Sequence, residues 1–363
     1  MKHQVINRTF VLLLLLTFLA AGPAFSKNKS IPLSEKIGQM ILIGFRGLDM
    51  PTLLKAEINS GKIGGVILLP YNIKDRSQLS ATVKKLRSVK ARYPLLVGID
   101  QEGGLIGRLK SANGFPDLPS AQEMAATRST EEAFSLYLKM AGTLKDVGIN
   151  LNFAPVVDLN INPNSPVIGR LQRSFSPTPE IVVDYAEAFI RAHKQAGILT
   201  CLKHFPGHGS AGKDSHLGLT DVTRTWSEAE LIPYRELMKR VMVDLIMTAH
   251  IVDQNVDPLY PASLSSWQVQ ERLRDEMGYQ GVVITDDLQM GAVGLTYPLE
   301  VSVIQAVNSG SDILLFANYY DPDPKIAEKV SAIIIKAVKN GKISPQRIDE
   351  SFARITKLKR QVK

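Results

Sequence analysis

The residue types most able to do chemistry are concentrated in one polar stretch near the middle of the chain. Residues Lys203 to Gly209 read KHFPGHG, and Asp214 and His216 follow a few positions later. The apolar residues 197–202 directly before this stretch predict a buried strand, so the polar side chains begin where a strand ends. Enzymes built from alternating strands and helices carry their catalytic groups at such ends. The stretch is therefore a candidate active site.

The two histidines inside the stretch do not predict a metal site. His204 and His208 are four residues apart, as in a helical zinc-binding pair. Pro206 and Gly207 lie between them and disfavour the helix that would align the two rings. A phosphate-binding loop is also excluded, because Asp214 stands where such a loop needs a serine or threonine. We expect neither a metal nor a cofactor.

Asp214 and His216 remain as the pair with catalytic potential. Residues two apart in an extended loop point the same way, so the Asp214 carboxylate can accept a hydrogen bond from the His216 ring. Such a partner raises the basicity of an imidazole and fixes its tautomer, which suits a proton donor and acceptor working near neutral pH. The alternative is that both are ordinary polar loop residues. The density of polar groups around them favours catalysis.

The N-terminal residues predict export. Lys2 and Arg8 precede an apolar run over residues 10–21, and small residues follow it up to Ser26. A basic head, a short apolar core and a small-residue exit are typical of a secretory signal peptide, here residues 1–26. An uncleaved anchor is the alternative. No later apolar run is long enough to span a membrane, so we expect a periplasmic or secreted protein without an integral membrane span after signal removal.

The composition fits a packed globular protein. Hydrophobic residues make up 45% of the chain, and the single cysteine, Cys201, excludes an intrachain disulfide. Removing 26 of the 363 residues leaves 337, which is within the range of one α/β barrel. The net charge is +8, but the basic residues are scattered and lack interleaved aromatic side chains, so we expect no nucleic-acid partner. The lysine-rich residues 357–363 predict a frayed helix end.

Apolar runs and amphipathic stretches alternate along the chain. The runs predict eight short buried strands, at residues 39–45, 64–69, 95–99, 149–153, 198–202, 245–248, 281–284 and 312–316. Helices are predicted at residues 76–93, 129–147, 179–196, 225–243 and 266–277, with a helix-start signal at Ser129–Glu132 and a capping box at Ser227–Glu230. This alternation predicts an α/β fold, a single-domain and locally irregular (β/α)8 TIM-type barrel over residues 27–363. A doubly wound open sheet is the alternative.

Polar residues recur where the predicted strands end. They come from distant parts of the sequence: Asp100, Asn152, Asp158, Lys203, His204, His250 and Asp286. Parallel strands of a barrel all end on one face, so these side chains are expected to converge on a single pocket. The repeated occurrence of Lys, His and Asp at such ends predicts a functional site.

Three motifs in this order resemble glycoside hydrolase family 3. They are Ile99–Gly104 (IDQEGG), Lys203–Gly209 with Asp214–His216, and Thr285–Met290 (TDDLQM). The resemblance is greatest to the β-N-acetylhexosaminidase (NagZ-type) branch, and it extends from about Leu33 to the end of the chain. It implies a (β/α)8 catalytic domain and retention of anomeric configuration. Many family members carry a second α/β domain after the barrel, so this chain resembles the single-domain form.

The resemblance also implies roles for individual residues. Asp286 is the expected nucleophile, and His216, supported by Asp214, is the expected acid/base. The positions matched to sugar binding are Asp100, Arg108, Arg173, Lys203 and His204. Neighbouring side chains at a strand end point to opposite sides, so Asp287 is expected to brace the following turn rather than line the pocket. Glycines around the motif are expected to let the loop that carries His216 move.

Two departures from the family pattern affect this site. The arginine that usually follows Glu102-Gly103-Gly104 is Leu105, which predicts the loss of a bracing charge in or beneath the site. Two extra residues precede Arg173, so Arg170 is an alternative to it as the sugar-binding arginine.

The sequence therefore predicts a monomeric enzyme that acts on carbohydrate, a retaining exo-β-N-acetylhexosaminidase. Its substrates would be N-acetylglucosaminides from peptidoglycan fragments or chitooligosaccharides. The alternatives are a phosphorylase or a β-glucosidase of the same family, or a non-catalytic glycan-binding barrel. The intact Asp286, Asp214 and His216 argue against the last of these.

Overall fold

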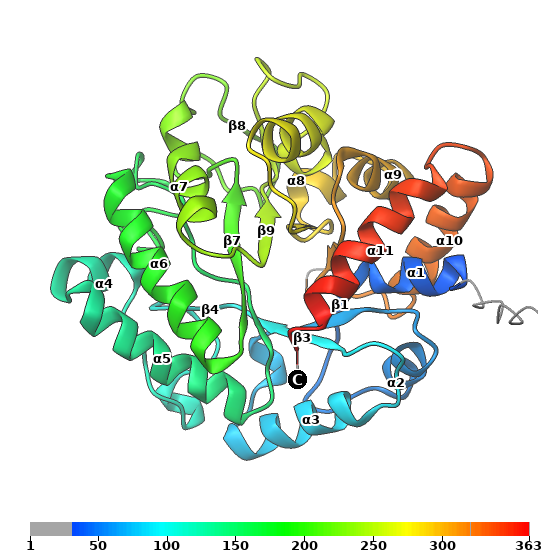
Figure 1. Cartoon of the computed structure of the whole chain (residues 1–363), viewed down its shortest axis with the longest axis horizontal. Coiled ribbons are helices and arrows are strands. Elements are labelled where there is room, and N and C mark those ends of the chain that lie inside the picture. Colours follow the sequence, from blue (N-terminus) through cyan, green and yellow to red (C-terminus); the bar gives the residue numbers. More distant parts are fainter. Residues whose placement is uncertain (1–30, 320, 363) are drawn as a thin grey trace, which may run out of the picture. The chain divides into compact units, whose positions relative to one another are not determined.

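The computed structural model describes residues 31–319 and 321–362, so the predicted signal peptide lies outside the described residues. Residues 32–363 form one compact unit. Its centre is a sheet of parallel strands surrounded by helices (Figure 1). The eight strands are β1 (Ile41–Gly44), β2 (Gly65–Leu68), β3 (Leu96–Ile99), β6 (Leu151–Asn152), β7 (Leu199–Phe205), β9 (Leu245–Thr248), β11 (Val282–Thr285) and β12 (Leu314–Phe316). Each overlaps a predicted strand.

The sheet closes into a barrel. The strands lie side by side in chain order, from β12 through β1 and β2 round to β11. A parallel bridge between Ile284 and Ile313 joins the two ends of this sheet. Thr285 N–H donates to the Ile313 carbonyl at 3.0 Å, and Ile313 N–H donates to the Val283 carbonyl at 3.0 Å. The predicted (β/α)8 barrel is confirmed, and the open doubly wound alternative is wrong.

Helices follow the strands as the alternation predicted. They are α1 (Leu33–Gln39), α2 (Thr52–Asn59), α3 (Arg76–Ser88), α4 (Ala121–Thr127), α5 (Thr130–Asp146), α6 (Pro179–Ala196), α7 (Ile232–Arg240), α8 (Gly291–Gly294), α9 (Leu299–Ser309), α10 (Ile326–Lys339) and α11 (Pro345–Lys359). Residues Trp267–Glu276 form a π-helix. Among the described residues, none of the helices combines the length and the apolar character needed to cross a membrane.

The predicted helix start at Ser129–Glu132 is confirmed and has the form of a capping box, whereas the capping box predicted at Ser227–Glu230 is absent. Ser129 and Glu132 exchange the expected hydrogen bonds at the start of α5, with N···O distances of 3.3 and 2.8 Å. The Ser227–Glu230 box does not form. Glu230 is buried, and its Oε2 accepts a hydrogen bond from the Gly209 N–H at 2.9 Å. The capping prediction was wrong because a distant loop, rather than the helix start, uses this carboxylate.

The C-terminal end of the chain packs against the start of the barrel. Helix α11 continues to Lys359, which is buried rather than frayed. The Lys359 Nζ donates to Gln39 Oε1 and to the Gly64 carbonyl, both at 2.6 Å. Burial lowers the pKa of Lys359 to about 7. The exposed-tail prediction failed because both acceptors lie about 300 residues away in sequence, beyond any local pattern.

The burial of Lys359 makes stability depend on pH. The unfolded chain keeps this proton up to its ordinary pKa of 10.5, whereas the folded chain releases it at about 7. The unfolded state therefore binds more protons between these values, and the contribution of Lys359 to the free energy of unfolding rises with pH across this window. Lys359→Met removes that slope. We expect the stability of the variant relative to wild type to be greatest at or below pH 7 and to decline towards pH 10.

Urea unfolding between pH 6 and pH 10 measures this difference. Lys357 lies on the same helix but is exposed, so Lys357→Met serves as the control and should leave the slope unchanged. Parallel stability curves for Lys359→Met and wild type would contradict the expectation.

Candidate active site

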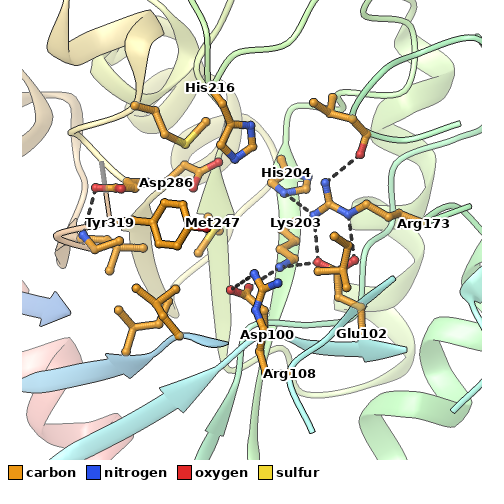
Figure 2. Close-up of a pocket in the computed structure, with 18 of the residues that line it drawn as sticks. Asp100, Glu102, Arg108, Arg173, Lys203, His204, His216, Met247, Asp286 and Tyr319 are labelled. Atoms are coloured by element: carbon orange, nitrogen blue, oxygen red, sulfur yellow. Dashed lines mark hydrogen bonds and ion pairs between the residues drawn. The ribbon is translucent and has the colours of Figure 1, made fainter. Parts of the chain in front are cut away.

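A cavity of about 350 Å³ lies at the carboxyl ends of the barrel strands. All the residues predicted for catalysis or sugar binding line it: Asp100, Arg108, Arg173, Lys203, His204, Asp214, His216 and Asp286. Figure 2 labels all of them except Asp214 and shows the labelled side chains directed into one space. The convergence expected of parallel strands brings together residues up to 186 positions apart, from Asp100 to Asp286. Asn152, Asp158 and His250 were expected in the same pocket, but they do not line it.

The buried Lys203 ammonium is the centre of the cationic wall. The sequence predicted a strand that ends at residue 202, before Lys203. Strand β7 instead runs to Phe205, so Lys203 lies inside the strand. Its Nζ lies 2.8 Å from Asp100 Oδ1 and 2.7 Å from Glu102 Oε1. These two carboxylates raise the pKa of Lys203 by more than burial lowers it. The strand can therefore carry a charged residue at a buried position, which hydropathy alone does not predict.

Arg173 is held by Glu102, one of the two carboxylates that contact Lys203. Its Nε and Nη2 donate to the two oxygens of Glu102, each at 2.8 Å, and its Nη1 donates to the Val167 carbonyl at 2.8 Å. Burial raises the pKa of Glu102, but Arg173 and Lys203 lower it by more, to about 2. Arg170 is exposed, so Arg173 is the arginine that reaches the cavity.

Glu102 was not predicted as a site residue. It follows Asp100 by two positions, and side chains two apart on an extended segment share a face. That periodicity was the available signal.

A short hairpin made of β4 (Gln101–Gly103) and β5 (Ile106–Gly107) carries Arg108 to the cavity. Arg108 Nη2 donates to Asp100 Oδ2 at 3.2 Å. Leu105 is 61% exposed at the turn of this hairpin, so its side chain lies on the surface rather than beneath the site. The predicted loss of a bracing charge is therefore wrong, because Arg108, Lys203 and Arg173 brace the two carboxylates.

Asp158 fixes the orientation of His204. The buried Asp158 carboxylate accepts from His204 Nδ1 at 2.7 Å and from the backbone N–H groups of His204 and His208 at 3.0 and 2.8 Å. Nδ1 therefore carries the proton, and Nε2 accepts from Arg173 Nη2 at 3.2 Å. His204 thus presents an oriented ring to the cavity. Asp158 had been noted only as a polar strand end.

Asp286 and Asp287 differ in environment although they are adjacent. Asp286 follows β11, and burial raises its pKa, but the imidazole of His250 and two other histidines lower it by more. Burial raises the pKa of Asp287 to about 6. Asp287 Oδ1 accepts from the backbone N–H groups of Gln289 and Ala317 at 3.1 and 3.0 Å, as expected of a bracing residue. Both residues border the cavity, so the expectation that Asp287 would lie outside it is wrong.

The segment Asp214–His216, here called the flap, forms a turn that carries the predicted dyad. Asp214 Oδ1 accepts from both the backbone N–H and the ring Nδ1 of His216, each at 2.8 Å. The predicted contact is present, although the backbone is a turn rather than extended. The His216 ring is 39% exposed and points into the cavity with the Asp286 carboxylate (Figure 2).

The motif glycines next to the flap are required by packing. A Cβ at Gly207 would lie 2.4 Å from Glu230 Cβ, and one at Gly209 would lie 1.7 Å from the Leu159 carbonyl oxygen. Close packing therefore accounts for glycine at these two positions, and the predicted movement of the loop stays a prediction. Gly212, where a Cβ would meet no atom within 4 Å, has open space around it.

This arrangement can support substitution at a sugar carbon. Asp286 supplies an ionised carboxylate, the Asp214–His216 dyad can transfer a proton, and the paired cations can orient hydroxyl groups. Apolar side chains, including Ile67, Met247, Leu315 and Tyr319, complete the wall.

Comparison with known proteins agrees with this geometry. The profile of the glycosyl hydrolase family 3 N terminal domain matches residues 32–358. A beta-hexosaminidase of Tolumonas auensis is 40% identical over 285 residues, 77% of this chain and 82% of that protein. Beta-hexosaminidase A of Pseudoalteromonas piscicida is 32% identical over 95% of this chain, which spans only 64% of that protein.

A solved family 3 beta-N-acetylglucosaminidase from a Paenibacillus species superimposes with a TM-score of 0.85 and 36% identity. The match covers 92% of this chain and 63% of that one. A (β/α)8 barrel whose cavity joins a carboxylate, an imidazole and paired cations at strand ends is the architecture of a glycoside hydrolase. The chain belongs to glycosyl hydrolase family 3. The names of these relatives agree with the predicted branch.

The ionic wall should contribute strongly to stability. Glu102→Ala leaves Arg173 and Lys203 without a shared buried partner, so we expect the free energy of unfolding to fall by about 3–5 kcal/mol. Glu276→Ala removes an exposed pair with Arg235 and is the matched control, expected to cost about 0–1 kcal/mol. Urea denaturation of both variants measures the difference. Equal losses would show that the buried network is not coupled as described.

Proposed function

We propose that the protein is a monomeric, retaining exo-β-N-acetylhexosaminidase that releases terminal β-linked N-acetylglucosamine. One observation supports this most: the Asp286 carboxylate and the His216 ring line the same cavity, and each has its own supporting contacts. The names of the family 3 relatives support the choice of sugar. The chain spans less than two thirds of the length of some of these relatives.

Asp286 is the proposed nucleophile. Its environment favours the charged carboxylate, and Oδ1 accepts the Asp287 N–H at 2.8 Å, which fixes the orientation of the group. In the first step a carboxylate oxygen bonds to the anomeric carbon while the bond to the leaving oxygen breaks. His216 gives its Nε2 proton to that leaving oxygen. The product is a covalent glycosyl-enzyme and the free alcohol.

His216 then reverses its role. Because Nδ1 is hydrogen-bonded to Asp214, Nε2 is the nitrogen available to accept a proton from water. The water oxygen bonds to the anomeric carbon and the ester bond to Asp286 breaks, which restores both groups. Two inversions at one carbon give overall retention.

The remaining cavity residues account for binding of a terminal sugar. Lys203, Arg108 and Arg173 are paired with Asp100 and Glu102, so hydroxyl or acetamide groups would meet donors and acceptors already fixed in position. Apolar residues Ile67, Met247 and Leu315 line the wall. A cavity of about 350 Å³ suits exo action on one sugar at a chain end.

We further propose that the enzyme acts outside the cytoplasm, on peptidoglycan fragments or chitooligosaccharides. Residues 1–26 support export. Comparison of kcat/KM on chitobiose and on an anhydromuropeptide would choose between the two substrates.

Removal of the nucleophile should abolish turnover. We expect Asp286→Ala to reduce hydrolysis of a chromogenic N-acetylglucosaminide by roughly 10⁴-fold or more. Asp146, exposed on helix α5, provides the control Asp146→Ala, which should retain wild-type activity. Continued turnover by Asp286→Ala would contradict the assignment. Added inorganic phosphate distinguishes a phosphorylase, because that enzyme would release a sugar 1-phosphate.

Removal of the acid should depend on the leaving group. His216→Ala is expected to lose about 10²- to 10⁴-fold on natural disaccharides, which need protonation of the leaving oxygen. The loss on a dinitrophenyl glycoside should be much smaller in the first step, because that group leaves without a proton. Pre-steady-state measurement of phenol release follows this step alone. Equal losses on both substrates would refute the acid role.

A further inference from the structure

His208 lies behind the active site and contacts the flap. Its ring is 2% exposed, and Nε2 is 3.2 Å from the Ser215 hydroxyl. Ser215 is also buried and stands between Asp214 and His216 in the chain. A buried hydrogen bond therefore connects the KHFPGHG motif to the residue at the middle of the proposed dyad. Neither His208 nor Ser215 lines the cavity.

The backbone around His208, the motif residue in this hydrogen bond, is hydrogen-bonded to buried carboxylates. The His208 backbone N–H donates to Asp158 Oδ1 at 2.8 Å, and the next residue, Gly209, donates to Glu230 Oε2 at 2.9 Å. Both carboxylates are fully buried. His208 is thus attached to the barrel by residues on either side of it and provides a fixed point for the flap.

The flap is held on its other side by the segment that follows Asp286. Gly291 N–H donates to the His216 carbonyl at 3.0 Å, and Ala292 N–H donates to the Ser215 carbonyl at 3.1 Å. A Cβ at Gly291 would lie 2.7 Å from the His216 carbonyl oxygen, so this close approach requires glycine. The backbone bonds fix the flap towards the nucleophile side, and the His208–Ser215 bond fixes it towards β7.

The His208 ring is maintained at a cost in stability. Burial lowers the pKa of His208 to about 4, so the ring is neutral near pH 7. Its Nδ1 is buried and has no hydrogen-bond partner among the described residues. An unpaired buried polar atom is destabilising, and an aromatic hydrocarbon side chain of similar shape would avoid this cost. The polar contact that the ring does make is with Ser215.

We propose that His208 is a positioning residue for His216 and acts through the Ser215 hydroxyl. The hydrogen bond holds the flap so that the imidazole of His216 stays directed at the leaving oxygen of a substrate that Asp286 is about to attack. The proposal rests on the acid/base role proposed above for His216. It predicts that loss of the bond impairs proton transfer and leaves attack by Asp286 intact.

Ser215→Ala tests this with the smallest change. We expect the rate of the first step to fall about fivefold to tenfold on aryl N-acetylglucosaminides with poor leaving groups, because the variant lacks one hydrogen bond. The dinitrophenyl substrate should be unaffected in that step. Ser215→Thr keeps the hydroxyl and should restore the rate. His208→Phe, which keeps the ring shape without its nitrogens, should reproduce the Ser215→Ala pattern from the other partner.

The His216→Ala variant separates a positioning role of Ser215 from general damage to the fold. If Ser215 acts through His216, then adding Ser215→Ala to His216→Ala should cause no further loss. Ser210 is another buried serine of the same loop, and its hydroxyl makes no hydrogen bond to the flap among the described residues. Ser210→Ala is therefore the matched control and should keep the wild-type dependence on leaving group. Thermal unfolding confirms that each variant is folded.

The outcomes are distinguishable. Equal losses on all leaving groups, or an additional loss in the His216→Ala background, would overturn the positioning role while leaving the proposed function intact. Absence of turnover by wild type, or a His216→Ala variant whose loss does not depend on the leaving group, would overturn the proposed function, and the role of His208 would fall with it. A variant pair that matches the expected pattern supports both.

Discussion

The site depends on the pairing of buried charges, and Lys203 is where that pairing is centred. An ammonium inside a barrel strand is tolerated only when carboxylates compensate it, and Asp100 and Glu102 both lie within 2.8 Å of it. Glu102 in turn holds Arg173, while Asp100 holds Arg108. Two carboxylates and three cations from four segments of the chain therefore fix one another. This arrangement explains why the wall of the cavity is already ordered before a sugar enters it.

Opposite this wall, the proposed catalytic groups are supported differently. Asp286 and Asp287 are neighbours, yet the surroundings shift their pKa values in opposite directions. Asp286 lies among imidazoles and stays ionised, whereas Asp287 is buried against backbone N–H groups and braces the turn. Environment, rather than residue type, separates a reactive carboxylate from a structural one. His216 lies on a turn outside the barrel, and its side chain is 39% exposed.

The KHFPGHG motif combines both kinds of support. Lys203 and His204 reach the cavity, whereas His208 points behind it towards the flap. Gly207 and Gly209 are required because the buried Glu230 and the Leu159 carbonyl pack directly against the backbone there. The glycines of the motif are therefore required by close packing, whereas Lys203 and His204 contribute polar groups to the cavity. At Gly207 the absence of a Cβ lets the Glu230 carboxylate approach the Gly209 N–H, which donates to it.

The sequence by itself determined the barrel and many of the polar residues that line its cavity, although it missed Glu102 and placed Asp287 outside. Eight apolar runs separated by amphipathic stretches specify alternating strands and helices, and residues at the strand ends must then share one face. Local patterns also specified the Asp214–His216 contact, because the two partners are only two positions apart.

Only the tertiary structure decided how polar groups are paired over long distances. Glu230 was expected to cap its own helix, and Lys359 to lie in a frayed tail, but each is buried against a partner from another element. Arg173 rather than Arg170 reaches the cavity because Glu102 meets it there. Periodicity reports which side of an element faces inward, and it carries no information on which buried donor will meet which acceptor. That choice depends on how the whole barrel closes.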